Sequence, residues 1–239
     1  MSSPAVDPHA VARRQGLSVG VATGVYGISF GALGVAAGLD VWQTMALSLL
    51  LFTGGSQFAL IGIIGSGGNP VTAVATSTLL GIRNGLYGLQ LARVLDLRGW
   101  RRVAAAHVTI DESTAVALAQ DDRAVQRTGF WAGGLGVFVF WNLATLAGAL
   151  VGNAIGDPRA WGLDAAAAAA FVALIWPRLR DRTARVTAAL AAAIALIAMV
   201  PTPAGIPVLL AGLAPIVVGL LDTAPSRARD IEQPEGDLL

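Results

Sequence analysis

The sequence predicts an all-α integral membrane protein, a polytopic helical bundle with about seven hydrophobic segments, at least one of them broken or re-entrant. Three observations predict this class. The 239 residues are 55% hydrophobic and only 13% charged, roughly half the charged fraction of a soluble domain. The uncharged stretches approach or exceed the roughly 20 residues with which a helix crosses a bilayer. The apolar runs also lack the two-residue alternation of membrane β-barrels.

The composition and the motifs exclude several other classes of protein. The 16 cationic and 15 acidic residues give a net charge of +1, which is no basic excess for binding nucleic acid. The chain has no cysteine, so disulfides and thiolate metal ligands are excluded. HExxH, P-loop and EF-hand patterns are missing. We therefore expect no enzyme, no cofactor, no metal site and no nucleic-acid partner.

The pattern of charges predicts one transmembrane domain over residues 16–222, between polar tails at 1–15 and 223–239. The C-terminal tail is rich in proline and charge, a composition typical of disorder. Residues 103–120 mix apolar and charged positions, which fits an interfacial helix, a re-entrant piece or a polar span. The expected helices cover residues 17–38, 43–64, 70–91, 129–152, 161–177, 185–201 and 205–222.

The arginine clusters constrain the topology. All of them favour the cytoplasmic side of the membrane. If the N-terminal tail is cytoplasmic and three helices cross the membrane before residue 93, however, the cluster at residues 93–102 would lie outside. Either one early segment is broken or re-entrant, or the N-terminal tail lies outside. The clusters lie at residues 13–14, 93–102, 123–127, 178–185 and 227–229.

Glycines recur at helical spacing in the first hydrophobic segment. Gly16, Gly20 and Gly24 are four residues apart, and Gly27 and Gly31 continue the stripe. Small residues at this spacing let helix backbones approach closely in a membrane. The stripe therefore serves either packing within this chain or docking of a separate membrane subunit.

A polar interruption lies inside the second hydrophobic segment. Gly54 and Gly55 precede the hydrogen-bonding residues Ser56 and Gln57, a combination that breaks a helix in mid-membrane. Backbone groups freed at such breaks bind substrates in many transporters. The alternative is a packing notch in which Gln57 bonds to a neighbouring helix.

Arg83 is the charge in the middle of the third hydrophobic segment. A cation at the bilayer centre costs roughly 2.5–3.5 kcal/mol, so Arg83 either reaches the interface or pairs with a carboxylate or a substrate anion. Asp111 and Glu112 lie on the weakly apolar segment 103–120. They suit proton coupling or pairing with Arg83, or else they belong to a solvated interfacial face.

In this order the clusters resemble the AzlC family of branched-chain amino acid permeases, from about Gly20 to Asp222. One element departs from the family pattern, since Gly81 stands in place of asparagine and Asn84 in place of histidine. The matching stretches are Gly27–Gly31, Phe52–Phe58, Arg83–Gly88, Thr109–Ser113, Trp141–Gly148 and Gly162–Asp164 with Phe171.

The resemblance implies export of valine, leucine, isoleucine or similar amino acids across a prokaryotic plasma membrane. It also implies a small hydrophobic AzlD-type partner subunit. We expect a secondary transporter, driven by the proton motive force. The alternative is a non-transporting membrane scaffold or sensor subunit, in which interior polar residues would be scarce.

An amino acid presents a carboxylate, an ammonium group and a side chain, and each needs a partner. We expect the carboxylate near the backbone of Gly54 and Gly55 with Arg83. The ammonium suits backbone carbonyls, Gln57 or the two acidic residues, and the side chain suits an apolar pocket. The candidate substrate site comprises Gly54, Gly55, Ser56, Gln57, Phe58, Tyr26, Arg83, Asn84 and Trp141, and the candidate coupling group comprises Asp111, Glu112 and Arg83.

Overall fold

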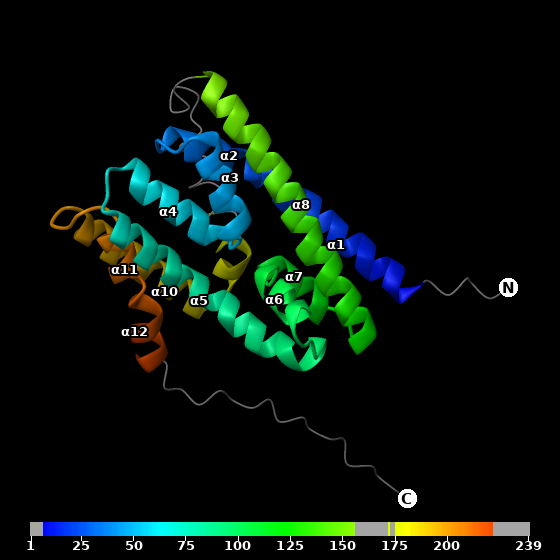
Figure 1. Cartoon of the computed structure of the whole chain (residues 1–239). Coiled ribbons are helices and arrows are strands. Elements are labelled where there is room, and N and C mark those ends of the chain that lie inside the picture. Colours follow the sequence, from blue (N-terminus) through cyan, green and yellow to red (C-terminus); the bar gives the residue numbers. More distant parts are fainter. Residues whose placement is uncertain (1–6, 156–171, 173–174, 222–239) are drawn as a thin grey trace, which may run out of the picture.

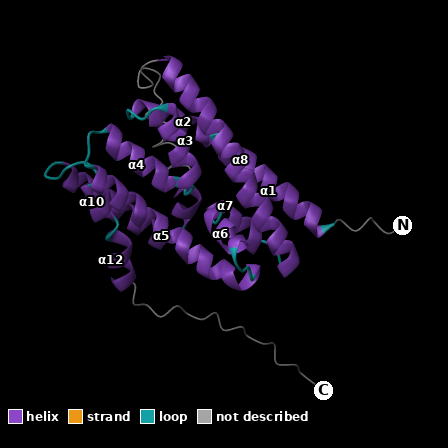
Figure 2. Cartoon of the chain, viewed as in Figure 1, coloured by secondary structure: helices purple, strands orange, loops and turns teal. Residues whose placement is uncertain are grey.

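The computed structural model describes residues 7–155, 172 and 175–221, and these contain helices and no strand (Figure 2). The chain begins with α1 (Pro8–Gly24) and α2 (Tyr26–Ala36), separated only at Val25. Asp7 caps α1 by accepting the N–H of His9 at 2.9 Å, and Pro8 follows as the first helical residue, which suits its missing N–H. Helix therefore begins well before residue 17 and includes part of the expected polar tail.

The long helix α8 (Arg123–Ile155) packs in parallel along α1 and α2 (Figure 1). The glycine stripe forms this contact. A Cβ on Gly20 would lie 2.7 Å from the backbone of Gly136, and one on Gly16 would lie 2.6 Å from the backbone of Gly133. Only glycine allows this approach. Of the two explanations for the stripe, packing within the chain is the correct one, because α8 occupies it.

The expected helix 43–64 is broken and re-entrant. It consists of α3 (Val41–Leu50) and α4 (Gly55–Gly65), joined at Gly54, whose φ of 64° and ψ of −100° favour glycine. Both outer ends of this first hairpin lie beside the end of α2: α3 follows it directly, and a Cβ on Gly65 would lie 3.1 Å from Ala37. The first hairpin thus enters and leaves at the same end of the molecule.

The helix α5 (Pro70–Leu95) then runs to the opposite end, where a second hairpin begins (Figure 1). This hairpin comprises α6 (Trp100–His107) and α7 (Asp111–Leu118). It returns beside the middle of α1, where Gln120 donates to Gln15 at 3.0 Å. Of the three possibilities for residues 103–120, the structure therefore supports a re-entrant piece.

The two hairpins enter from opposite ends, and their tips meet near the middle of α8. The ring of Phe52 from the first tip lies 6.2 Å from His107 of the second. Both rings contact Phe138 of α8, at centroid distances of 5.1 and 5.6 Å. Residues that are distant in sequence are therefore brought together in the interior.

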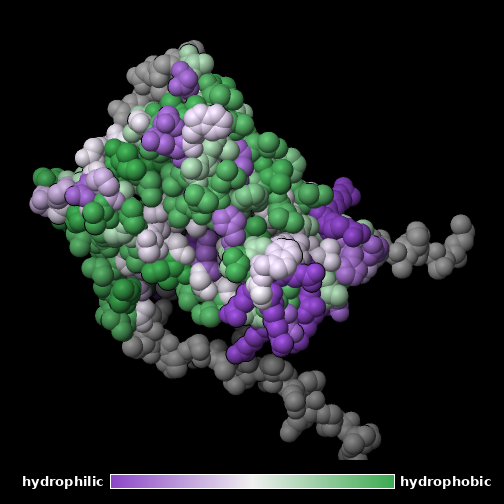
Figure 3. All heavy atoms as spheres, in the orientation of Figure 1, coloured by the Kyte–Doolittle hydropathy of each residue, from purple (hydrophilic) through white to green (hydrophobic). Residues whose placement is uncertain are grey.

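The re-entrant first hairpin resolves the topology. The starts of α1 and α8 lie together with the end of α5, since His9 bonds to Thr128 at 2.8 Å and Arg127 donates to the carbonyl of Val94 at 3.1 Å. Hydrophilic residues gather at this end of the surface (Figure 3). We call it the arginine-rich end, and the positive-inside rule predicts that it faces the cytoplasm.

The C-terminal part contributes η2 (Trp176–Arg180), α10 (Arg182–Met199), α11 (Ile206–Ala211) and α12 (Ala214–Leu221). The helices α11 and α12 pack against α10, as expected for an out-and-back pair. The expected helix 161–177 falls almost wholly outside the described residues, as do Gly162–Asp164, Phe171 and the tail 223–239.

Three described helices are long and apolar enough to cross a membrane, namely Pro8–Ala36, Arg123–Ala154 and Arg182–Met199. The expectation of about seven such segments is not confirmed among the described residues. Two of the expected helices, 43–64 and 205–222, are each divided into shorter helices. The helix α5 has 26 residues, but Arg83 and Asn84 interrupt its apolar character.

Candidate functional site

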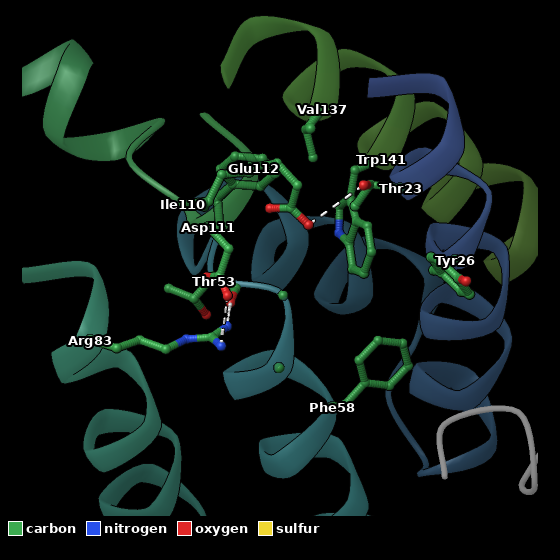
Figure 4. A pocket seen from close by; sticks show the side chains of 13 residues that line it. Thr23, Tyr26, Thr53, Phe58, Arg83, Ile110, Asp111, Glu112, Val137 and Trp141 are labelled. Carbon is green, nitrogen blue, oxygen red and sulfur yellow. Dashed lines mark hydrogen bonds and ion pairs between the residues drawn. The ribbon is translucent and has the colours of Figure 1, made fainter. Parts of the chain in front are cut away.

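A cavity lies where the two hairpin tips meet α1, α2, α5 and α8 (Figure 4). It measures about 70 Å³, several times the roughly 10–15 Å³ that one water molecule needs on the same measure. It is therefore large enough for more than a single water. This central cavity is lined by Thr23, Tyr26, Phe52, Thr53, Gly54, Gly55, Phe58, Arg83, Ile110, Asp111, Glu112, Val137 and Trp141.

Arg83 connects α5 to both hairpin tips. Its Nη1 lies 3.0 Å from Oδ2 of Asp111, and its Nη2 donates to the carbonyl of Thr53 at 3.4 Å. The Arg83 side chain is 36% exposed and that of Asp111 25%. The guanidinium is thus paired with a carboxylate, which was one of the two expectations for it, and the pair is partly exposed.

The start of α4 contributes positive electrostatic potential to the cavity. The first N–H groups of a helix have no acceptor within the helix, and its dipole places partial positive charge there. The first turn of α4 contains no acidic residue to offset this charge. Gly54 and Gly55 line the cavity; since the N–H of Gly54 is bonded to Gln57, the donors left for an anion are those that follow it in the first turn of α4.

The start of α7 has the opposite character. Asp111 and Glu112 lie in its first turn, where carboxylates are stabilised by the helix dipole. Asp111 is paired with Arg83, but Glu112 has no salt bridge within the described residues, and its one long-range hydrogen bond there, 3.5 Å from Thr23, is long. The cavity therefore has a cationic side and a side with a carboxylate that forms no ion pair within the described residues.

Aromatic rings form a further wall of the cavity (Figure 4). The ring of Trp141 lies 6.0 Å from both Phe58 and Phe30, measured between centroids. Phe52, Phe58, Ile110, Val137 and Trp141 also belong to the main buried apolar cluster. The arrangement suits a small ligand with two opposite charges and an aliphatic group.

Most of the candidate residues meet at this cavity. Eight of them line it, namely Tyr26, Gly54, Gly55, Phe58, Arg83, Asp111, Glu112 and Trp141. Sequence reasoning did not include Thr23, Phe52, Thr53, Ile110 and Val137. Thr53 was recognisable from its place beside Gly54, whereas nothing local distinguishes Thr23 or Val137 from other helical residues.

Gln57, Ser56 and Asn84 do not line the cavity. Gln57 is fully buried, accepts the N–H of Gly54 at 3.2 Å and donates to the carbonyls of Leu47 and Ser48 at 3.4 Å. Gln57 therefore lies outside the candidate substrate site in which it was expected, and the packing alternative, in which it bonds to a neighbouring helix, is correct. Ser56 is buried against α5, where a Cβ on Gly81 would lie 3.6 Å from its Oγ.

Asn84 lines a separate groove between α5 and α6, together with Thr109, Arg98 and Arg102. This groove leads toward the arginine-rich end. Arg83, next to Asn84, lines the central cavity instead, as does Asp111 near Thr109. The Arg83–Asp111 pair therefore lines the central cavity, while Asn84 and Thr109, close to it in sequence, line the groove.

The fold and the site define a helical membrane protein in which two re-entrant hairpins meet at a central charged cavity. The sequence matches the AzlC protein family over residues 18–155, more than half of the chain. The protein therefore belongs to the AzlC family.

Two relatives are uncharacterized membrane proteins of Helicobacter pylori. The one from strain J99 is 26% identical over 175 residues, which cover 72% of this chain and 76% of the relative. The one from strain 26695 is 26% identical over 129 residues, or 53% of this chain and 57% of the relative. No solved structure matches the chain. The protein is accordingly a membrane protein.

Proposed function

We propose that the protein exports branched-chain amino acids, such as valine, leucine and isoleucine, across a prokaryotic plasma membrane. It acts as the large subunit beside a small AzlD-type membrane protein. Membership of the AzlC family and the apolar helices support a transport role. The observation that favours an amino acid is that Arg83 and the start of α4 face one side of an apolar cavity and Glu112 faces another.

Each part of a branched-chain amino acid finds a partner in this cavity. The carboxylate binds near the first N–H groups of α4 and Arg83, as anions do at half-helix N-termini in transporters. The ammonium group binds Glu112, which has no salt bridge within the described residues. The aliphatic side chain packs against Phe58, Tyr26 and Trp141.

The Arg83–Asp111 pair serves as a gate toward the arginine-rich end. The pair lines the cavity, and Asn84 and Thr109, close to it in sequence, line the groove between α5 and α6. A substrate carboxylate that binds Arg83 competes with Asp111, and a proton on Asp111 removes its attraction to Arg83. Either event weakens the pair, and the second couples substrate movement to the proton motive force.

Efflux of radiolabelled L-valine tests this function. Cells that lack their own exporters are loaded with valine and made to express the chain together with its small subunit. We expect faster efflux than from cells with the empty vector, and we expect a protonophore to slow it. Efflux equal to the empty-vector level, from membranes that contain both subunits, would contradict transport and favour the sensor alternative.

A further inference from the structure

The wall of the central cavity contains a hydrogen-bond donor without an acceptor. The indole N–H of Trp141 has no hydrogen-bond partner within the described residues, although Trp141 is only 3% exposed. A buried tryptophan N–H usually finds an acceptor, and an unpaired one costs free energy. In Figure 4 the indole nitrogen lies on the ring edge that faces Glu112 and Thr53. This position suits a ligand that supplies the acceptor.

Glu112 offers the complementary group in the same cavity. Its Oε1 accepts a 3.5 Å hydrogen bond from Thr23, and it forms no salt bridge within the part of the chain that the structure describes. The carboxylate and the indole N–H do not bond to each other. A negatively charged acceptor and a free donor thus face one space of about 70 Å³.

We propose that Glu112 and Trp141 together bind the α-amino-carboxylate group of the ligand. The ammonium donates to Glu112, one carboxylate oxygen accepts from Nε1 of Trp141, and the other oxygen faces Arg83 and the start of α4. The inference rests on the proposed function and deepens it, because it names two residues that bind the amino and carboxylate groups of the substrate. Free α-amino acids fit, since both charged groups are on one carbon, whereas amino alcohols lack the negatively charged carboxylate and fatty acids lack the ammonium.

Binding measurements on the purified full chain in lipid nanodiscs test the two contacts separately. The three probes are L-valine, L-valinol, which lacks the carboxylate, and isovalerate, which lacks the ammonium. Trp141→Phe keeps an aromatic ring but removes the N–H. We expect it to weaken L-valine and isovalerate about tenfold, the effect of one charge-assisted hydrogen bond, and to leave L-valinol unchanged.

Glu112→Gln gives the opposite pattern. It should weaken L-valine and L-valinol about tenfold and leave isovalerate unchanged or bound more tightly, because the lost partner is the ammonium group. Trp131→Phe is the matched control. Trp131 lies on the same helix, packs on Phe130 at 5.3 Å and is not part of the cavity, so all three affinities should stay at the wild-type values.

Several outcomes would overturn the inference. One is a Trp141→Phe protein that binds L-valine as tightly as the Trp131→Phe control. Another, which needs no variant, is wild-type protein that binds none of the probes, or that binds L-valinol or isovalerate as tightly as L-valine. The transport proposal is decided separately: Trp141-dependent binding without valine efflux would refute transport and leave this inference intact.

Discussion

Gln57 and Ser113 fix the two hairpin tips in the same way. Gln57 accepts the N–H of Gly54 at 3.2 Å, and Ser113 accepts the N–H of Ile110 at 3.0 Å. Each of these two side chains accepts the N–H of the residue three positions before it. Each lies in the first turn of the second helix of its hairpin. The same local device therefore holds both broken segments where they meet, although they enter from opposite ends.

The capping role of Gln57 predicts a stability effect. Gln57→Leu removes three hydrogen bonds of a fully buried side chain, and each stranded backbone group costs about 1–3 kcal/mol. We expect a clearly lower thermal midpoint for the purified protein. Where the variant remains folded, its L-valine affinity should stay within about twofold of wild type, because Gln57 does not line the cavity. A large loss of affinity at unchanged stability would contradict this role.

The Arg83–Asp111 pair predicts a difference between yield and transport. Arg83→Gln leaves Asp111 without its cation. Because the pair is partly exposed, the cost falls between the roughly 1 kcal/mol of a surface pair and the roughly 3–5 kcal/mol of a buried one. We expect lower yield and no valine efflux from Arg83→Gln.

Arg83→Gln combined with Asp111→Asn should recover the yield but not the efflux, as measured by chromatography of the solubilised protein and by the valine assay. Arg93→Gln at the end of α5 is the control, since that arginine lies outside the cavity. Wild-type efflux from the double variant would refute a role for the pair in transport.

The backbone at Gly54 predicts a requirement for glycine. Its φ of 64° and ψ of −100° are unfavourable for any side chain, at a cost of about 1–3 kcal/mol. We expect Gly54→Ala to lower the thermal midpoint and to reduce efflux, although no atom would touch the added Cβ. Gly85→Ala is the matched control, because its Cβ also meets open space but lies within a regular helix. Equal midpoints for the two variants would argue against strain at the tip.

The re-entrant first hairpin predicts which residues an impermeant thiol reagent reaches. The chain has no cysteine, so single cysteines give an unambiguous signal. Trp42, Val71 and Trp100 are 79%, 76% and 75% exposed. In intact cells we expect labelling of Trp42→Cys and Val71→Cys, whereas Trp100→Cys should react only after permeabilisation. Labelling of Trp42→Cys and Val71→Cys from opposite sides would mean that α3 and α4 cross the membrane.

Much of the architecture was determined by the sequence itself. The scarcity of charges and the long apolar runs predict a helical membrane protein, and Gly54 beside polar residues predicts where the second segment breaks. These features are local, because the cost of charge in lipid and the backbone freedom of glycine depend on the residue and its immediate neighbours. The position of Arg83 inside an apolar segment likewise limited it to a few possible environments.

Only the tertiary structure decided which groups share the cavity. Thr23 reaches Glu112 across 89 positions of sequence, and Gln57 faces α3 instead of the cavity. The glycine stripe packs on α8, and the first hairpin turns back at its tip. Helical spacing specifies a face but not the helix that covers it, because that choice depends on the shapes of surfaces that are distant along the chain.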